Sequence, residues 1–130
     1  MDWTPQWEDS GEVPQDSALE RWADRFLAAM DLCHRRARVV SSDIRNMMEQ
    51  VGFVDIQEQT IRCYVNPWSP DPQEQETARW FNMGLNHSLE ALGLMPMVEK
   101  LGMTVAEVKD LCAEAVEENT KLRFHGYCTM

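Results

Sequence analysis

The sequence is poor in basic residues and has no long hydrophobic run. It contains 22 Asp or Glu against 12 Lys or Arg in 130 residues, so its net charge is −10. Nucleic acids and anionic membrane surfaces bind basic faces, and this balance argues against both as partners. No apolar stretch approaches the length of a membrane span and no signal peptide is recognisable. We therefore expect a cytoplasmic protein, with the nucleus as the alternative.

Patterns typical of metal sites and disulfides are also missing. The cysteines form no C-x-x-C pair, and the histidines form no H-x-x-x-H motif or Cys/His cluster. These residues are Cys33, Cys63, Cys112, Cys128, His34, His87 and His125. A structural zinc site needs several such ligands at short spacings, so we expect no metal. Without an export signal, we expect the thiols to be reduced.

Helix signals are plentiful, and they predict about five helices. Ser17 and Glu20 form a capping-box pattern at the first of them, and Asp71-Pro72 is a strong start signal further on. The apolar stripe of the second helix is Ile44, Met47, Met48 and Val51. The five expected helices cover residues 17–36, 42–51, 71–93, 96–101 and a last stretch that begins at 104.

Strand signals are few. Residues 53–66 read as one long strand whose apolar phase switches near 57–59, and 121–130 as a short one. Two strands do not make an independently stable sheet, so we expect them to pair between subunits.

The predicted fold is α+β and mostly helical, in a single domain spanning 1–130. Its parts are an irregular acidic arm (1–16), two helices (17–52), a strand (53–66), a helical cap (69–120) and a short strand (121–130). In the arm, Trp3 and Trp7 are expected to dock on some surface, because large rings are costly to expose, and they favour the association with a partner considered below.

Several segments resemble the C-terminal half of the LaeA-like class I methyltransferases of filamentous fungi. They are "DWTPQWEDSGEVPQDSALERW", "MMEQVGF", "VDIQEQTIRCYVNPW", "RWFNMGLNHSLEALGL", "LGMTVAEVKDL" and "LRFHGY". The resemblance implies a Rossmann-like, seven-stranded sheet with S-adenosylmethionine at the ends of its first strands. Residues 1–3 would end the fifth strand, 53–65 would form the sixth, the tail would begin the seventh, and 69–120 would cap a substrate pocket.

The sequence departs from this family in its glycines. A cofactor site of this type needs a glycine-rich turn after the first strand, so that the backbone can approach the cofactor. No two of the six glycines are closer than nine residues, so the chain has no G-x-G. We therefore expect no cofactor and no methyl transfer by the chain alone.

Three functional hypotheses follow. The first is a non-catalytic accessory protein that forms a homodimer, or a heteromer with a full-length methyltransferase-like protein. The second is a cofactor-independent cyclase or pericyclase acting on a polyketide-like or terpenoid-like small molecule, because such chemistry can run on shape and one acid or base. The third is a truncated product without selected activity. For the second, the catalytic candidates are His87 and His125, and the substrate-binding candidates are Tyr64, Trp68, Trp80, Asn82, Met83 and Asn86.

Each of these residues also has a structural interpretation. Trp80 at helical spacing is more typical of a core than of a pocket wall. A single histidine such as His87 is more often a surface residue, and His125 belongs to a stretch that marks the fold. We assign the cysteines no nucleophilic role.

Overall fold

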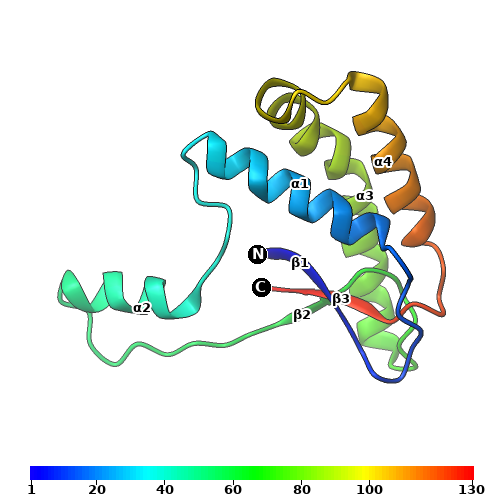
Figure 1. Cartoon of the computed structure of the whole chain (residues 1–130). Coiled ribbons are helices and arrows are strands. Elements are labelled where there is room, and N and C mark those ends of the chain that lie inside the picture. Colours follow the sequence, from blue (N-terminus) through cyan, green and yellow to red (C-terminus); the bar gives the residue numbers. More distant parts are fainter.

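The computed structural model describes all 130 residues and contains four helices and one small sheet (Figure 1). The strands are β1 (Asp2–Trp7), β2 (Arg62–Tyr64) and β3 (Gly126–Thr129). They pair in the order β1-β3-β2, and β3 is antiparallel to both neighbours. The sheet therefore joins the beginning, the middle and the end of the chain.

The strand predictions were only partly right. The three strands pair within one chain, and pairing between subunits is not needed to form this sheet, because the first residues supply a third strand that the sequence pattern hid. Pro5 interrupts the alternation in this segment, but a proline is tolerated on an edge strand such as β1. The strand expected over 53–66 is reduced to Arg62–Tyr64, because β3 pairs only with the end of that segment.

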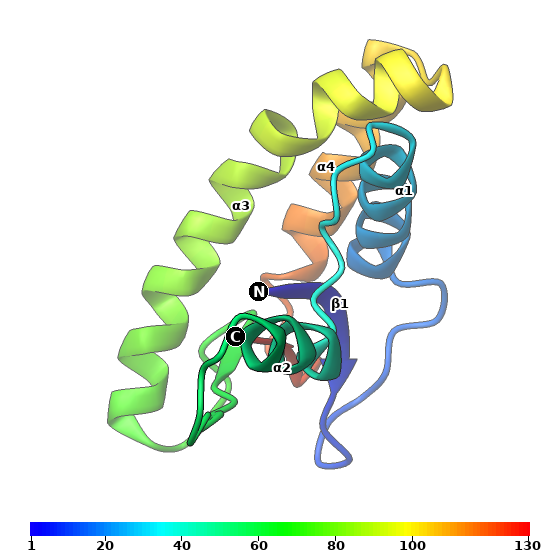
Figure 2. The ribbon, with the colours of Figure 1, turned by 90° about the vertical axis from the view of Figure 1, so that its left-hand side faces the viewer.

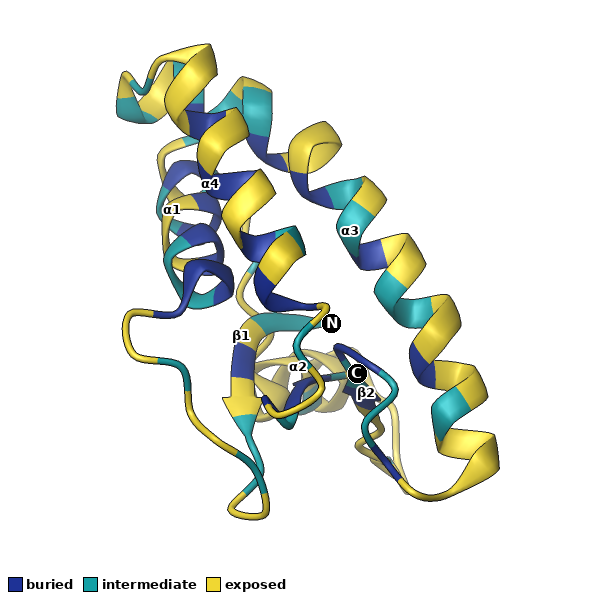
Figure 3. Ribbon diagram, turned by 90° about the vertical axis from the view of Figure 1, so that its right-hand side faces the viewer, coloured by how far each residue is buried: buried dark blue, intermediate teal, exposed yellow.

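Three helices form the second layer of the domain. They are α1 (Ala18–Leu32), α3 (Pro72–Leu101) and α4 (Val105–Glu118), and each packs against the other two. α1 contacts β1 and α3 contacts β2, so the helices cover one face of the sheet (Figures 1 and 3). No helix is both long and apolar enough to cross a bilayer.

The expected break between residues 93 and 96 does not occur, which reduces the helix count from five to four. α3 continues through Pro96, whose ring costs one backbone hydrogen bond, and its axis turns near this end in Figure 2. The helix continues because Met97, just beyond the proline, is fully buried in the core. Gly93 is needed for close packing: a Cβ there would lie 3.0 Å from Nε1 of Trp22.

Aromatic side chains fix the helices to the sheet. Trp22 and Phe26 on α1 stack with ring centroids 5.0 Å apart, and Trp3 on β1 lies across both at 5.8 and 5.4 Å. Trp7 packs edge-on against Phe124, 6.4 Å away, and its Nε1 donates to Glu20 at 2.6 Å. Trp3 and Trp7 therefore dock as expected, and the surface on which they dock belongs to the same chain.

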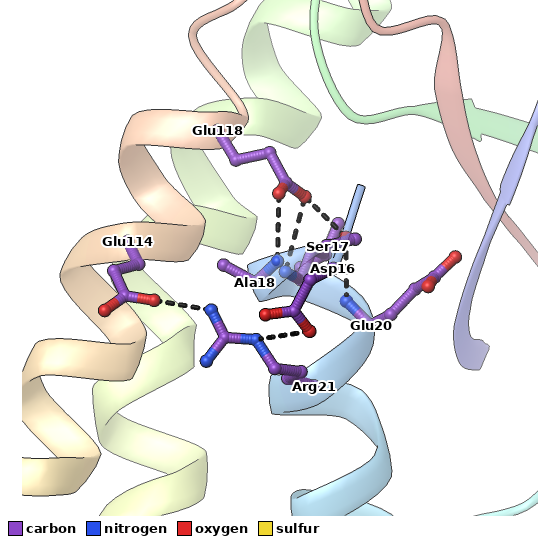
Figure 4. Close-up of polar contacts among 8 residues, drawn as sticks. Asp16, Ser17, Ala18, Glu20, Arg21, Glu114 and Glu118 are labelled. Atoms are coloured by element: carbon purple, nitrogen blue, oxygen red, sulfur yellow. Dashed lines mark hydrogen bonds and ion pairs between the residues drawn. The ribbon is translucent and has the colours of Figure 1, made fainter. Parts of the chain in front are cut away.

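The beginning of α1 is held by a residue from the other end of the chain (Figure 4). The Ser17 hydroxyl accepts a hydrogen bond from the amide of Glu20, as the capping-box pattern predicts. The side chain of Glu20 bonds Trp7, however, and Glu118 of α4 takes its place. The Glu118 carboxylate accepts from the Ser17 hydroxyl at 2.6 Å, the Ala18 amide at 2.9 Å and the Leu19 amide at 3.4 Å. A buried carboxylate thus meets a helix N-terminus, where backbone amides and the helix dipole favour negative charge.

The remaining helix, α2 (Ser41–Gln50), contacts no other helix or strand. Figure 1 shows it standing apart from the three packed helices. None of its residues is buried, although its sequence predicts a buried stripe. The helix was predicted correctly, but the chain buries none of its apolar side chains.

Replacing Glu118 by Ala should lower the free energy of unfolding by about 1–3 kcal/mol, because the Ser17 hydroxyl and two amides lose a buried acceptor. The neighbouring Glu117 is a matched control. Its exposed side chain pairs only with Lys121, so Glu117→Ala should cost less than about 0.5 kcal/mol. Urea denaturation followed by circular dichroism would measure both. Equal losses in the two variants would contradict the role given to Glu118.

Candidate functional site

Aromatic side chains gather on the face of the sheet that the helices leave open. Tyr64 and Tyr127 are register partners on β2 and β3, with ring centroids 6.3 Å apart. Trp68 lies edge-on to Tyr64 at 4.9 Å and stacks on His125 at 3.9 Å, with 7° between the planes. Tyr64, Trp68, His125 and Tyr127 form what we call the aromatic cluster. Three of the eight predicted site residues, Tyr64, Trp68 and His125, are thus brought together.

His125 is held on three sides. Trp68 covers one face of its ring, and its Nδ1 lies 3.0 Å from the Ser10 hydroxyl. The turn that contains Gly11 comes so close that a Cβ there would lie 2.4 Å from Cγ of His125. The ring nitrogen pairs with a hydroxyl and not with a carboxylate, so this is not the charge-assisted pair that orients a catalytic histidine. The arrangement supports the structural interpretation, and the acid–base role of His125 stays a prediction.

Charged groups border the aromatic cluster. The guanidinium of Arg62 lies 4.8 Å from the centroid of the Tyr127 ring and pairs with Glu8, whose charge raises the pKa of Arg62. Burial raises the pKa of the Tyr64 phenol, and the charges of Glu74 and Glu8 add to the effect. Tyr64 is therefore protonated at neutral pH.

Arg62 and Tyr127 also belong to this site, although they were not among the residues predicted for it. The alternation of residues 122–128 was a usable signal for Tyr127, because it gives Tyr127 on β3 the same parity as His125, which directly precedes the strand. Arg62 could not be found in this way, since the contact with Glu8 depends on a distant part of the chain.

The other aromatic and basic candidates lie on α3. Trp80, Met83 and His87 share one helix face as predicted, and that face is exposed. The Trp80 indole is 63% exposed and donates to Glu76 at 2.8 Å, which is a surface contact within one helix. His87 borders an open hollow of about 410 Å³ with Glu90. These three residues are not part of the aromatic cluster.

Asn82 and Asn86 take part in a polar seam between α3, the end of α4 and the end of β2. Asn82 Nδ2 donates to the Val65 carbonyl at 2.6 Å and to the Asn119 carbonyl at 3.2 Å. Asn86 Nδ2 donates to Asn82 Oδ1 at 3.1 Å, and Asn119 Nδ2 donates to Asn86 Oδ1 at 2.9 Å. These amides are engaged in holding the fold together, and their substrate-binding role stays a prediction.

A cavity of about 330 Å³ lies between α2, residues 56–60 and the two ends of the chain. Its apolar lining includes Ile44 and Met48 of α2, Met1 and Met130. None of the eight predicted site residues lines it. The sequence signal that could have found it is the apolar stripe of α2, which we had assigned to a core.

All four cysteines are free thiols, and three of them are protected from solvent by burial. Cys63, Cys112 and Cys128 are buried, and burial raises the pKa of each, for Cys128 to about 12. Cys33 is partly exposed at the end of α1. No three His, Cys, Asp or Glu side chains come together in a way that could hold a metal ion.

Alkylation of the native protein at pH 8 should therefore show one fast thiol and three slow ones. A thiol whose pKa is raised holds little reactive thiolate at this pH, and burial blocks access as well. Iodoacetamide labelling followed by peptide mass spectrometry would identify Cys33 as the fast site. All four thiols should react at similar rates in urea, and rapid native labelling of Cys128 would contradict the structure.

Comparison with known proteins finds clear relatives. The secondary metabolism regulator laeA of Gibberella zeae is 51% identical over 130 residues, which is 100% of this chain and 41% of that protein. The secondary metabolism regulator LAE1 of Hypocrea atroviridis is 45% identical over 130 residues, again 100% of this chain and 37% of the relative. The protein-methionine methyltransferase laeA of Chaetomium globosum is 32% identical over 129 residues, which is 99% of this chain and 40% of that protein.

No protein-family model matches the chain, and no solved structure matches it. The chain spans about two fifths of the length of the relatives. The segments that suggested a LaeA-like protein lie within these alignments, and the resemblance is confirmed. Over its whole length, the chain is a homologue of part of the LaeA/LAE1 secondary metabolism regulators.

Proposed function

We propose that the chain is a non-catalytic, methyltransferase-like accessory protein in fungal secondary metabolism. The relatives are named as secondary metabolism regulators, and one of them as a protein-methionine methyltransferase. Because the chain matches only about two fifths of each, their activity does not transfer to it as a whole.

The observation that carries this proposal is that neither turn from a strand to a helix, β1 to α1 or β2 to α3, has an open glycine-rich backbone. Nucleotide-type cofactors bind where a glycine-rich turn lets backbone amides approach them at the beginning of a helix. Between β1 and α1 the only glycine is Gly11, and the space beside it is filled by the chain's own His125. Between β2 and α3 there is no glycine. Neither turn provides the open backbone that S-adenosylmethionine needs, so the chain alone does not bind it.

The uncovered helix supports an accessory role. Half of the 18 exposed large apolar side chains lie within residues 39–61, on and around α2. Such a concentration of exposed apolar side chains is typical of a binding site for another protein. β1 is an edge strand, so one of its sides has no partner strand within the chain, and edge strands are sites at which proteins add a further strand. We propose that a full-length LaeA/LAE1-type protein, or a second copy of the chain, covers these surfaces.

The cavity beside α2 favours a second candidate function. Its volume lies in the range of small-molecule pockets, and its apolar lining suits a hydrophobic ligand such as a polyketide-like or terpenoid-like compound. A cofactor-independent cyclase would use this cavity with Asp2 or Glu58, which line it, as the acid or base. Turnover of a pathway intermediate by the purified chain, lost in Glu58→Gln or Asp2→Asn, would favour this function over the accessory role.

Titration calorimetry with S-adenosylmethionine should give no binding heat for the chain alone. The expectation follows from the filled turn at Gly11, because a cofactor would have to displace His125 from its stack with Trp68. A known S-adenosylmethionine-dependent enzyme in the same buffer serves as the positive control. A dissociation constant in the micromolar range would overturn the non-catalytic proposal.

Replacing Met47 by Glu should weaken association with the Gibberella zeae relative, or with a second copy, by about tenfold or more. A carboxylate on the α2 stripe must be desolvated when the stripe is covered, and about 1.4 kcal/mol already corresponds to tenfold. Met83→Glu is the matched control, because Met47 is 53% exposed on α2 and Met83 is 48% exposed on α3. Light scattering and biolayer interferometry would measure both assemblies. Equal affinities in the two variants would exclude α2 as the contact, and no association in any form would overturn the accessory role.

A further inference from the structure

Two of the buried cysteines face each other across neighbouring strands. Cys63 on β2 and Cys128 on β3 are direct register partners. Ile61 and Met130, two positions further along, exchange both of their backbone hydrogen bonds at 2.8 Å, and the Val65 amide donates to the Gly126 carbonyl at 3.0 Å. In an antiparallel ladder such pairs recur at every second position, so Cys63 and Cys128 are also a hydrogen-bonded pair.

This register is compatible with a covalent link. The Cα atoms of a hydrogen-bonded antiparallel pair lie about 5.5 Å apart, and those of disulfides usually 4.4–6.8 Å apart. Direct partners project from the same face of a sheet. Here that face is the one against the helices, because Val65 and Cys128 are both part of the core cluster. The two thiols are close enough that the charge of Cys63 contributes to the raised pKa of Cys128.

We propose that Cys63 and Cys128 are a site of reversible oxidation, at which a small-molecule disulfide such as oxidised glutathione forms a cross-strand disulfide. In the first step the Cys63 thiolate attacks one sulfur of the oxidant, which forms a mixed disulfide and releases one thiolate. In the second step the Cys128 thiolate attacks Sγ of Cys63 and releases the second thiolate. The protein loses two protons and two electrons, and one molecule of oxidant becomes two molecules of thiol.

The position of the two residues gives the order of the steps. Cys63 is 8% exposed on a three-residue edge strand, whereas Cys128 is 1% exposed on the central strand. Local opening of the edge strand therefore exposes Cys63 first. Reaction is slow because burial raises the pKa of both thiols, and it ends with the disulfide because each cysteine has the other as its register partner.

The disulfide would change the mobility of one particular region. It fastens β2 to the central strand, close to the point where the uncovered residues 39–61 leave the domain. Oxidation should therefore restrict opening of β2 and leave the helical layer unchanged. This inference is independent of the proposed accessory role.

Oxidation of the full native chain with glutathione disulfide, followed by non-reducing peptide mapping, tests the proposal. We expect a linked Cys63–Cys128 peptide pair that dithiothreitol separates, and a simple glutathione adduct on Cys33. Cys112 is the matched control, because it is buried on α4 and its pKa is also raised by burial. It should remain a free thiol. Cys63 and Cys128 both remaining free after prolonged oxidation, or pairing with Cys112 instead, would overturn the proposal.

Two variants separate pairing from simple accessibility. Cys63→Ser should abolish the linked species and leave Cys128 as a thiol, whereas Cys112→Ser should leave the linked species unchanged. Hydrogen exchange should show slower opening of residues 61–65 in the oxidised protein than in the reduced protein. A linked pair that leaves this exchange unchanged would contradict the inferred effect on β2, and a linked species in Cys63→Ser would overturn the assignment.

Discussion

The fold depends on the contact between the Glu118 carboxylate and the first turn of α1. It joins residues 101 positions apart, from Ser17 to Glu118, and it is buried. A buried carboxylate is unfavourable unless donors surround it, and the hydroxyl and two amides of the α1 N-terminus satisfy this condition. On the surface beside it, the Arg21 guanidinium pairs with Glu114 at 2.5 Å and so fastens the same two helices a second time. These contacts fasten the end of α4 to the beginning of α1.

The alignment of α1 along α4 determines how the aromatic residues of the core pack. With α1 fixed along α4, Trp22 lies over Gly93 of α3 and stacks on Phe26, and Trp3 closes the cluster from β1. The three helices then cover one face of the sheet, and the aromatic cluster remains on the other. No residue of α2 is needed for any of these contacts. The chain thus has a complete core and, in addition, an apolar helix that the core does not use.

Local signals in the sequence were reliable where the contact itself is local. Asp71 caps α3, Thr104 and Glu107 form a complete capping box, and Gly102 ends α3 in the left-handed conformation. The prediction for Glu20 was wrong because Trp7 captures its carboxylate and a glutamate from the far end of the chain replaces it. No spacing rule within one segment can indicate such an exchange.

The same distinction between local contacts and contacts of distant segments explains why the sheet and the candidate site were predicted only in part. Residues 53–66 have the apolar pattern of a strand, but such a pattern does not reveal whether a partner strand lies opposite, and within this segment only Arg62–Tyr64 pair as β2 with β3. His125 was placed correctly on the tail, yet its stack with Trp68 and the close approach of Gly11 depend on three separate segments. For Trp80, Met83 and His87 the periodicity predicted a shared face correctly, but it could not show that this face is exposed.

The uncovered apolar residues connect the fold to the proposed role. A ten-residue helix that packs on no other helix or strand is marginally stable in water, because helix nucleation is costly and the gain per residue is small. Most helical stability in proteins comes from burial of an apolar face, and α2 carries such a face without burying it. The exposed apolar stripe therefore adds little to the stability of the isolated helix, and it can stabilise α2 only when another surface covers it. The relatives are about two and a half times as long as the chain, so a protein of their type contains additional structure that could provide that cover. We therefore expect the protein to act through α2, whose exposed apolar face is not used by the core.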